Sequence, residues 1–324
     1  MISNKNHFDF IIAGAGIVGL TVAYEIKSRI PQSKIAIFEK EADIGVHASG
    51  RNSGVLHSGI YYPSKTLKAE ICAKGNKKMV EFAMEHNIDF KKCGKIILAT
   101  KEEELVSLNS LLENAKNNNI PAQKIDNREV KEKEPYASNS FGAIFSPSTS
   151  VIDSLGVINK LRDILLSKNV RFLFNSTLRI KSLEANKFSN KESYSCGYFV
   201  NCAGAYADLI AKELNLLDEY TLVPFKGLYW KLTKEASRKV RGNIYPVPDL
   251  SVPFLGIHLT RVINEDVYIG PNSVPALSRE NYNLFQNLNF DESFEISKRL
   301  ISMYFKNNQN FRQLSRRELG NYLK

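Results

Sequence analysis

The fold is decided near the start of the chain, where residues 8–26 read FDFIIAGAGIVGLTVAYEI. An apolar run that ends at Ala13 predicts a short strand, and apolar residues at helical spacing from Val18 to Ser28 predict a helix. A second run, KIAIFE at residues 34–39, is rich in Ile and Phe and predicts another strand. Strand, helix and strand together fit the roughly 30 residues of a βαβ unit, which indicates a parallel sheet.

The turn between the first strand and the helix has the spacing of a dinucleotide-binding site. Gly14, Gly16 and Gly19 form GxGxxG directly after the strand. Gly14 permits a tight turn, Gly16 lets the backbone approach a pyrophosphate, and Gly19 lets helix and strand pack closely. Glu39 ends the second strand, where its carboxylate can accept hydrogen bonds from a ribose. An acid at this position argues against NADP, so the motif alone leaves FAD and NAD.

A glycine- and serine-rich segment, ASGRNSG at residues 48–54, favours FAD over NAD. The segment follows the second strand closely and is too rich in small and polar residues to belong to a core. Its backbone amides and small hydroxyls suit an extended ligand, which a flavin enzyme binds there and an NAD enzyme does not require. The residues concerned are Ser49, Gly50, Asn52, Ser53 and Gly54.

Composition restricts the class of protein. The 324 residues are 43% hydrophobic and 24% charged, which predicts about two globular domains. The net charge of +10 is spread along the chain and lacks the basic patch with aromatics that a nucleic-acid-binding protein has. The chain has no apolar run near the roughly 20 residues of a membrane span, and its cysteines form no CxxC pair or ligand set with His. We therefore expect a cytoplasmic protein without a metal, in which the basic end from Arg299 to Lys324 is a candidate for peripheral contact with the cytoplasmic membrane.

The predicted elements of two domains alternate along the chain. A nucleotide-binding fold is expected at residues 1–87 and 150–220, and a β-rich second domain at residues 88–149 and 221–290. A helical segment is expected at residues 291–324. The predicted fold class is therefore α/β, with α and β mixed: a Rossmann-like FAD-binding domain interleaved with a β-rich substrate domain.

Seven segments match one known family in order and spacing. They read DFIIAGAGIVGLTVAYEI, IFEKEADIGVHASGRNSGVLHSGIYYPSKTLKAEIC, CGKIILAT, VNCAGAYAD, VPFKGLYW, GNIYPVPDLSVPFLGIHLTR and IGPNSVPA. Together they resemble the FAD-dependent D-amino-acid-oxidase superfamily, and more narrowly the L-2-hydroxyglutarate oxidase/dehydrogenase family. The resemblance implies oxidation of a small 2-hydroxy dicarboxylate, L-2-hydroxyglutarate, to 2-oxoglutarate, with oxygen or a quinone as the electron acceptor.

The resemblance also implies roles for the residues of the nucleotide site. The three glycines of the first turn and Glu39 would hold the ADP half of FAD. The small and polar residues of 48–54 would run beside the pyrophosphate and the flavin. Ala203 and Gly204, at the end of a strand that reaches Cys202, would form a second turn that approaches the nucleotide.

Oxidising a 2-hydroxy acid requires a base for the hydroxyl proton, cations for two carboxylates and a dry pocket. His258 and His57 are the candidate catalytic bases, because a histidine needs only a small pKa shift to act near neutral pH. We favour His258 as the base and His57 as a contact to flavin or substrate, although the sequence also allows the reverse. Substrate contacts are expected from three cations and three polar side chains: Arg51, Lys226, Arg261, Tyr61, Tyr245 and Thr260.

The chain departs from the family pattern in three places. Family members usually have His where this chain has Arg51, and Arg where it has Lys226, which lacks the planar fork that grips a carboxylate at two points. Family members also continue, beyond the last residue of this sequence, with segments that close the flavin site. Two alternatives therefore stay open: a truncated or split member that is inactive without that segment, and a related FAD-dependent amino-acid or glycerol-3-phosphate oxidoreductase.

Overall fold

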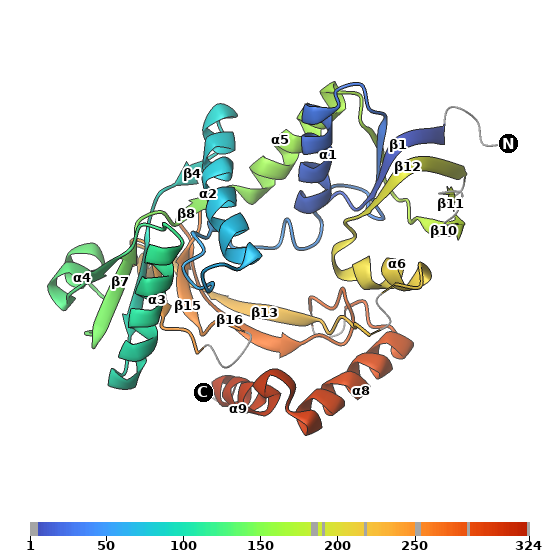
Figure 1. The fold of residues 1–324 in the computed structure, drawn as a ribbon. Coiled ribbons are helices and arrows are strands. Elements are labelled where there is room, and N and C mark those ends of the chain that lie inside the picture. The colour runs from blue at the N-terminus through green and yellow to red at the C-terminus, as the bar shows by residue number, and fades with distance from the viewer. Residues whose placement is uncertain are drawn as a thin grey trace. The chain divides into compact units, whose positions relative to one another are not determined.

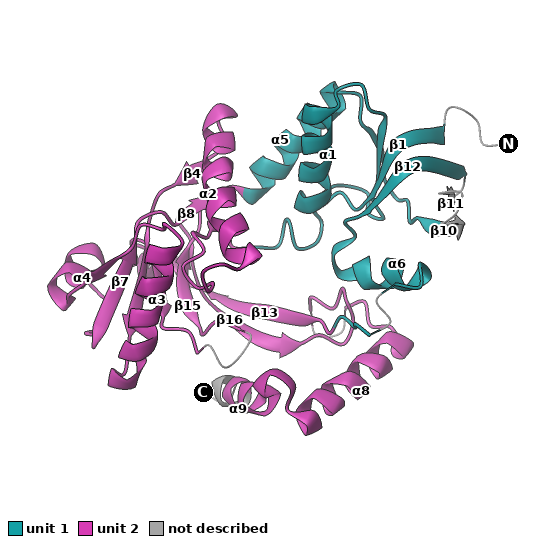
Figure 2. Ribbon diagram, in the orientation of Figure 1, with its two compact units in different colours: residues 1–52, 154–222 teal, residues 53–153, 223–324 magenta. Residues whose placement is uncertain are grey.

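The computed structural model describes residues 6–182, 187–189, 192–216, 219–249, 254–283 and 286–322. The chain forms two compact units, and each unit is made of two chain segments (Figure 2). The first unit comprises Met1–Asn52 and Ser154–Leu222, and the second comprises Ser53–Asp153 and Val223–Lys324. The sequence predicts that the first domain extends to residue 87, whereas the first segment of this unit ends at Asn52.

Residues 53–87 belong to the second unit, where helix α2 (Leu67–Glu85) is hydrogen-bonded to the backbone of that unit. The side-chain amide of Asn76 donates hydrogen bonds to the carbonyl oxygens of Leu56 and His57, both at 3.1 Å. The thiol of Cys72 also donates to the carbonyl oxygen of His57, at 3.6 Å. These contacts to distant backbone have no signal in the sequence.

The first unit contains a six-stranded sheet in the order β10-β11-β12-β1-β2-β9 (Figure 1). Its strands are β1 (His7–Ala13), β2 (Ile35–Phe38), β9 (Arg171–Leu173), β10 (Arg179–Ser182), β11 (Lys187–Ser189) and β12 (Ser193–Asn201). The four strands from β12 to β9 run parallel, and β10 and β11 extend the sheet in antiparallel fashion. Helices α1 (Ile17–Arg29) and α5 (Ser154–Ser167) pack against each other beside it. The predicted α/β class with a Rossmann-like parallel sheet is confirmed.

Strand β12 begins earlier than the sequence predicts. A polar segment is expected around residues 186–193 and a strand only from Tyr198, but β11 and β12 pair in antiparallel fashion between Lys187 and Ser195. Residues 186, 190 and 191 of that segment lie outside the described residues. Tyr194 and Cys196 are buried on one face, which is the alternation of a half-buried strand. Three serines in this stretch make the segment polar, so the alternation cannot be seen in the sequence.

The second unit contains a seven-stranded sheet in the order β13-β16-β15-β14-β5-β7-β6 (Figure 1). Its strands are β5 (Lys95–Ala99), β6 (Gln123–Ile125), β7 (Gly142–Ser146), β13 (Phe225–Lys231), β14 (Asn243–Pro246), β15 (His258–Arg261) and β16 (Val267–Pro275). A small sheet of β3 (Val55–Leu56), β8 (Ser150–Ile152) and β4 (Phe90–Lys91) lies beside it. Strand β5 pairs with β14 in parallel, and all other pairs of the large sheet are antiparallel.

The two faces of β5 pack against different helices. Ile97 and Ala99 point to the side of α3 (Leu105–Asn117), where they form a buried cluster with Leu108, Leu111 and Tyr245. Ile96 and Leu98 point to the side of α4 (Asn127–Lys133), against Val130. Because side chains alternate along a strand, Lys95 lies on the same face as Ile97 and Tyr245. This face of the sheet carries the candidate catalytic residues.

The C-terminal helices are α8 (Phe290–Lys306) and α9 (Phe311–Tyr322), as the sequence predicts. The sequence also predicts one apolar face on α8 with four members: Phe294, Leu300, Ile301 and Phe305. Leu300 and Met303 pack against Phe311, and Ile296 is buried. Phe294, Ile301 and Phe305 are instead more than half exposed, because α8 carries two apolar stripes and only one of them packs. Among the described helices, none is both long and apolar enough to cross a bilayer.

A buried carboxylate ties α4 to the start of β14. Glu134, which is 3% exposed, accepts hydrogen bonds from the backbone N–H groups of Arg241 at 2.9 Å and Gly242 at 2.5 Å. We expect Glu134→Ala to lower the free energy of unfolding by about 1–3 kcal/mol, because it leaves buried donors unpaired. Glu132→Ala is the control, since the side chain of Glu132 is exposed and forms an ion pair with the exposed side chain of Arg128. Urea unfolding followed by circular dichroism measures both, and equal stability of the two variants would contradict this role.

Candidate functional site

The glycine turn of the first unit is held against a second backbone turn. Gly14 has φ of +103°, and a Cβ placed there would lie 2.4 Å from the carbonyl oxygen of Cys202. A Cβ on Gly19 would lie 2.0 Å from the carbonyl oxygen of Gly14. Residues Gly14 and Cys202 are joined to their neighbouring strands by hydrogen bonds from their own N–H groups, to Phe38 and Ala13 respectively. The turns after β1 and β12 therefore approach each other as closely as backbone allows.

Two side chains complete this turn. Glu39 is buried, and its carboxylate accepts the N–H of Ala15 at 2.9 Å and the N–H of Glu41 at 3.0 Å. The hydroxyl of Ser49 accepts the N–H of Ile17 at 2.9 Å, in the first turn of α1. Ser49 and Glu39 thus reach the glycine turn from the segments that the sequence predicts.

The loop after β2 folds onto itself within the first unit. A Cβ on Gly50 would lie 2.3 Å from the carbonyl oxygen of Gly45. Asn52 donates to the carbonyl oxygens of Ala48 and Ser49, at 3.2 and 2.7 Å. The exposed side chain of Arg51 donates to the carbonyl oxygen of Val46 at 2.9 Å.

Ala203 and Gly204 lead from β12 into the short helix α6 (Ala207–Glu213). Gly204 has φ of +56°, and no atom lies within 4 Å of a Cβ placed on it. The backbone here is accessible to a ligand. The two other predicted cofactor residues, Ser53 and Gly54, belong to the second unit, where the carbonyl oxygen of Gly54 accepts the N–H of Ile152 at 2.9 Å.

The glycine turn fits the ADP half of FAD. Gly16 is the N-cap of helix α1, which has no acidic residue in its first turn, so the partial positive charge of the helix N-terminus can face a pyrophosphate. An ionised carboxylate has about four lone-pair sites, so Glu39 retains acceptors for ribose hydroxyls beyond its two backbone bonds. A 2′-phosphate would meet this carboxylate, which agrees with the exclusion of NADP.

The second unit gathers both predicted bases with two tyrosines. The rings of Tyr245 and His258 stack with centroids 3.9 Å apart, and the ring of His57 meets Tyr245 edge-on at 6.4 Å. Nδ1 of His258 lies 2.8 Å from the carbonyl oxygen of Gly256. A carbonyl can only accept, so Nδ1 carries the proton and Nε2 is left as the proton acceptor.

Lys95 is a member of this cluster that the sequence did not single out. Its side chain is 1% exposed, and its Nζ lies 4.2 Å from the ring centroid of Tyr61 and 5.0 Å from that of Tyr245. Among the described residues, Nζ of Lys95, Nδ1 of His57 and the hydroxyl of Tyr61 are buried without a hydrogen-bond partner. The segment CGKIILAT contains this lysine, but its place at the start of an apolar strand indicated only a strand end.

Burial controls the protonation of these groups. Desolvation lowers the pKa of His57 to about 3 and that of Lys95 to about 7, and it lowers the pKa of His258 as well. The positive charge of Lys95 acts in the same direction on both imidazoles. Both histidines are therefore neutral near pH 7, which is the state that accepts a proton.

The remaining predicted substrate contacts have other surroundings. Thr260 is fully buried and shares the sheet face of His258, whereas Arg261 lies on the opposite face, as strand alternation requires. The guanidinium of Arg261 donates to the carbonyl oxygens of Ser237 and Val240 at 2.9 and 2.7 Å. Lys226 donates to the side chain of Asn281 at 2.9 Å. The structure thus brings His57, Tyr61, Tyr245 and His258 together and gives Arg261 and Lys226 partners elsewhere.

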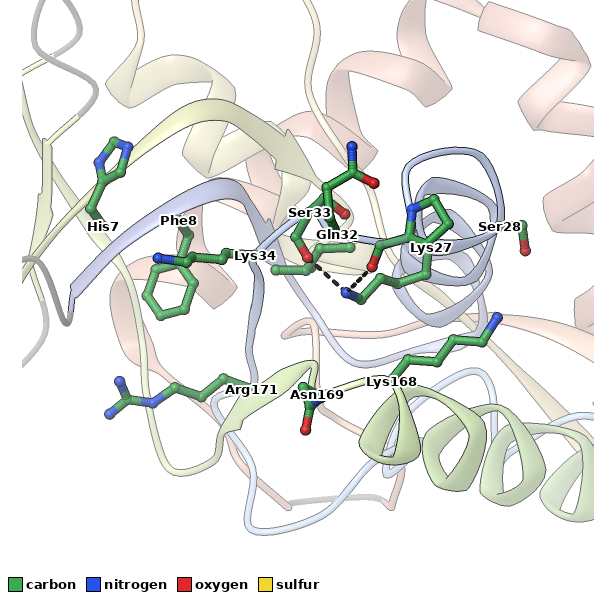
Figure 3. Close-up of a pocket in the computed structure, with 12 residues that line it drawn as sticks. His7, Phe8, Lys27, Ser28, Gln32, Ser33, Lys34, Lys168, Asn169 and Arg171 are labelled. Atoms are coloured by element: carbon green, nitrogen blue, oxygen red, sulfur yellow. Dashed lines mark hydrogen bonds between the residues drawn. The ribbon is translucent and has the colours of Figure 1, made fainter.

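A separate basic groove of about 950 Å³ lies at the amino ends of β1 and β2 (Figure 3). Lys34, Lys168 and Arg171 line it, as does Lys27. The ammonium of Lys27 is already bonded to the carbonyl oxygens of Pro31 and Ser33, at 2.8 and 2.7 Å (Figure 3). Ligands of parallel α/β sheets bind at the carboxyl ends of the strands, where the glycine turn lies, so this groove is not part of the cofactor site.

Comparison with known proteins agrees with this geometry. A family model described as FAD dependent oxidoreductase matches residues 9–316, so the chain belongs to the FAD-dependent oxidoreductase family, and its cofactor is FAD. Within that family it is similar to L-2-hydroxyglutarate dehydrogenases, as its sequence segments predict. It is 40% identical to the mitochondrial enzyme of Nematostella vectensis over 86% of this chain and 65% of the relative, and 37% identical to the enzyme of Indibacter alkaliphilus over 98% and 82%. The human mitochondrial enzyme is 36% identical over 87% of this chain and 64% of the relative.

The chain therefore spans slightly less than two thirds of the length of the human and Nematostella relatives. Solved structures share the fold at lower identity. L-alpha-glycerophosphate oxidase from Mycoplasma pneumoniae, solved with FAD bound, has a TM-score of 0.74 at 20% identity and covers 90% of this chain and 78% of its own. Glycine oxidase from Geobacillus kaustophilus has a TM-score of 0.72 at 19% identity, with coverages of 91% and 77%. These two likenesses support the fold class alone.

Proposed function

We propose that this protein oxidises L-2-hydroxyglutarate to 2-oxoglutarate with FAD as the hydride acceptor. The relatives named above are L-2-hydroxyglutarate dehydrogenases, and they support this choice of substrate. The observation that carries the reaction type is the buried imidazole of His258, whose Nδ1 contacts a backbone carbonyl so that Nε2 remains a proton acceptor.

In the proposed reaction, Nε2 of His258 takes the proton of the substrate hydroxyl. The C2–H bond breaks with its electron pair, and the former hydroxyl oxygen becomes the carbonyl oxygen of 2-oxoglutarate. Bound FAD would supply the acceptor for the hydride that leaves C2. The protein contributes a base that is neutral at working pH, and the buried ring of Tyr245 stacks against this base and shields it from water.

The cofactor residues of this proposal are those of the glycine turn and the loops beside it. Gly14, Gly16, Gly19 and Glu39 would hold the ADP half, and Ser49, Gly50, Asn52, Ser53, Gly54, Ala203 and Gly204 would line the rest of the cofactor. His57 would contact flavin or substrate, and Tyr61, Tyr245 and Thr260 would position the substrate. Arg51, Lys226 and Arg261 stay candidate carboxylate partners, although each already forms the hydrogen bonds described above.

Anaerobic titration of the FAD-loaded protein tests the proposal. We expect L-2-hydroxyglutarate to bleach the flavin absorbance band and to yield 2-oxoglutarate in equal amount. The D-enantiomer, amino acids and glycerol 3-phosphate are the comparison compounds. Bleaching by one of these in place of L-2-hydroxyglutarate would contradict the proposed substrate, and no bleaching by any of them would contradict the oxidoreductase activity of this chain.

We expect the electrons to pass from the flavin to oxygen or to a quinone. Aerobic turnover that forms one hydrogen peroxide per 2-oxoglutarate would identify oxygen as the acceptor. Turnover that requires an added quinone analogue would identify a quinone, and it would favour the predicted peripheral contact of the basic C-terminal helix with a membrane.

A further inference from the structure

We propose that Lys95, with Tyr61 and His57, forms a carboxylate-binding subsite for the substrate. The inference rests on the proposed function for the identity of the ligand, a dicarboxylate. It assigns a role to a residue that neither the sequence motifs nor the chemistry described above has used.

The first argument is that the cluster contains buried polar atoms without hydrogen-bond partners. Transferring an amine or hydroxyl out of water without a hydrogen-bond partner costs free energy, so such groups are rare in folded proteins. Here three buried polar atoms of one cluster, on Lys95, Tyr61 and His57, lack a partner among the described residues. Nζ and the tyrosine hydroxyl are donors, and a carboxylate oxygen is an acceptor for both.

The second argument is charge. The proposed substrate is a dianion, and buried anions require a cation. Lys95 is a cation on the sheet face that carries Tyr245 and His258, and its Nζ has no hydrogen-bond partner among the described residues. Arg261 lies on the other face with carbonyl partners and Glu265, and the ammonium of Lys226 is bonded to Asn281.

The third argument is the means of approach. Nζ lies over the faces of two tyrosine rings, which attract an ammonium but give it no oxygen acceptor. Four rotatable methylene groups let the ammonium turn toward an incoming carboxylate while the strand stays fixed. Strand β5 lies in the interior of the sheet between β14 and β7, so the base of this side chain is rigid.

The wild-type protein alone provides a test through pH. Lys95 has a pKa near 7, so glutarate binding should weaken by about tenfold or more between pH 6.5 and 8.5, because the ammonium is lost and the carboxylate loses its charge partner. The groups around it are not expected to titrate over this range. Burial raises the pKa of Tyr61, Tyr245 and Cys72. Burial lowers the pKa of His57 and His258, so both imidazoles are neutral over this range. Helix α3 faces the cluster with apolar side chains, and the exposed Lys68 of α2 acts on Cys72 rather than on Lys95.

Substitution separates a binding role from a structural one. Lys95→Met keeps the length of the side chain and removes an unpartnered amine, so we expect an unchanged or higher Tm. The matched control is Lys27→Met, because Lys27 is also buried but is bonded to two carbonyl oxygens, and its loss should lower the Tm by about 4 °C or more. A fall in Tm for Lys95→Met as large as that for Lys27→Met would indicate a structural lysine and overturn the proposal.

Calorimetric titration of the FAD-loaded protein gives the decisive comparison. The probe is glutarate, which has the chain length of the substrate and no hydroxyl to oxidise. We expect Lys95→Met to weaken glutarate binding by about 10- to 100-fold and to remove its pH dependence, while the exposed Lys116→Met leaves both unchanged. Equal affinity in Lys95→Met and wild type would overturn the subsite and leave the proposed function standing.

Acetate is the second probe, because it tests the subsite without the dicarboxylate. If wild type binds acetate through Lys95 but binds neither glutarate nor L-2-hydroxyglutarate, the subsite stands and the proposed substrate falls. If wild type binds none of the three, both are overturned.

Discussion

The His258→Ala variant is expected to reduce its flavin with L-2-hydroxyglutarate at least about 100-fold more slowly than wild type, the usual scale of general-base catalysis. Nδ1 of His258 contacts the carbonyl oxygen of Gly256, and burial holds the pKa of the ring below its ordinary value. The ring is therefore an uncharged acceptor at neutral pH. Anaerobic stopped-flow measurement of the flavin band at saturating substrate isolates this step from substrate binding and from reoxidation.

The pH profile gives the sign of the effect. A base must be neutral, so in wild type the rate should fall as pH drops through the pKa of His258, on the acid side of 6.5. This acid limb should be missing from the residual rate of His258→Ala. His258→Asn keeps a donor for the Gly256 carbonyl without a base, and it should be as slow as the alanine variant while retaining more stability. Unchanged reduction in His258→Ala, together with slow reduction in His57→Ala, would reverse the assigned roles.

Much of the first unit could be predicted because its signals are local. The glycine turn, α1 and β2 follow one another within 39 residues, and each has its own periodicity or spacing. The contacts of Glu39 to Ala15 and of Ser49 to Ile17 then follow from the geometry of a βαβ unit. Because the local sequence pattern agrees with the fold, such a unit can be predicted without any knowledge of tertiary structure.

The cluster of the second unit could be predicted only in part. His57, Tyr245 and His258 were candidates because they lie in recognisable segments, but the burial of Lys95 depends on neighbours far along the chain. Lys95 pairs with Asn243 of β14 on one side and with Ser146 of β7 on the other. Without that pairing, a lysine before four apolar residues predicts a solvated strand end.

Arg261 illustrates the opposite error. A lone arginine beside a candidate base suggests a carboxylate partner, and the side chain is indeed only 13% exposed. Its partners are nevertheless the carbonyl oxygens of Ser237 and Val240, more than 20 residues away, at the end of the short helix α7 (Lys234–Ser237). The partners of a buried charged side chain depend on which backbone groups the fold leaves unpaired. Sequence spacing does not predict those partners.

The Gly14→Ala variant is expected to weaken FAD binding by about 30-fold or more. Positive φ strains any residue with a Cβ by about 1–3 kcal/mol, and overlap with packed neighbours adds about 1–3 kcal/mol. At Gly14 both apply, because the Cβ would meet the backbone of Cys202, which cannot rotate away as a side chain can. Relief requires the turns after β1 and β12 to separate, and these turns define the nucleotide site. Fluorescence titration of apoprotein with FAD measures the loss.

Substitutions at two other glycines separate the two causes of the expected loss of FAD affinity, which are backbone strain and steric overlap. Gly204→Ala imposes positive φ with open space around the Cβ, so it should weaken FAD binding less than Gly14→Ala. Gly75→Ala lies within α2 at an exposed site with no atom within 4 Å, and it should stabilise the helix by about 0.5–1 kcal/mol without changing FAD affinity. The order Gly14, Gly204, Gly75 in lost affinity would show that contact between the two turns, beyond backbone strain, holds the cofactor site together. Equal losses for Gly14→Ala and Gly204→Ala would mean that strain alone accounts for the effect.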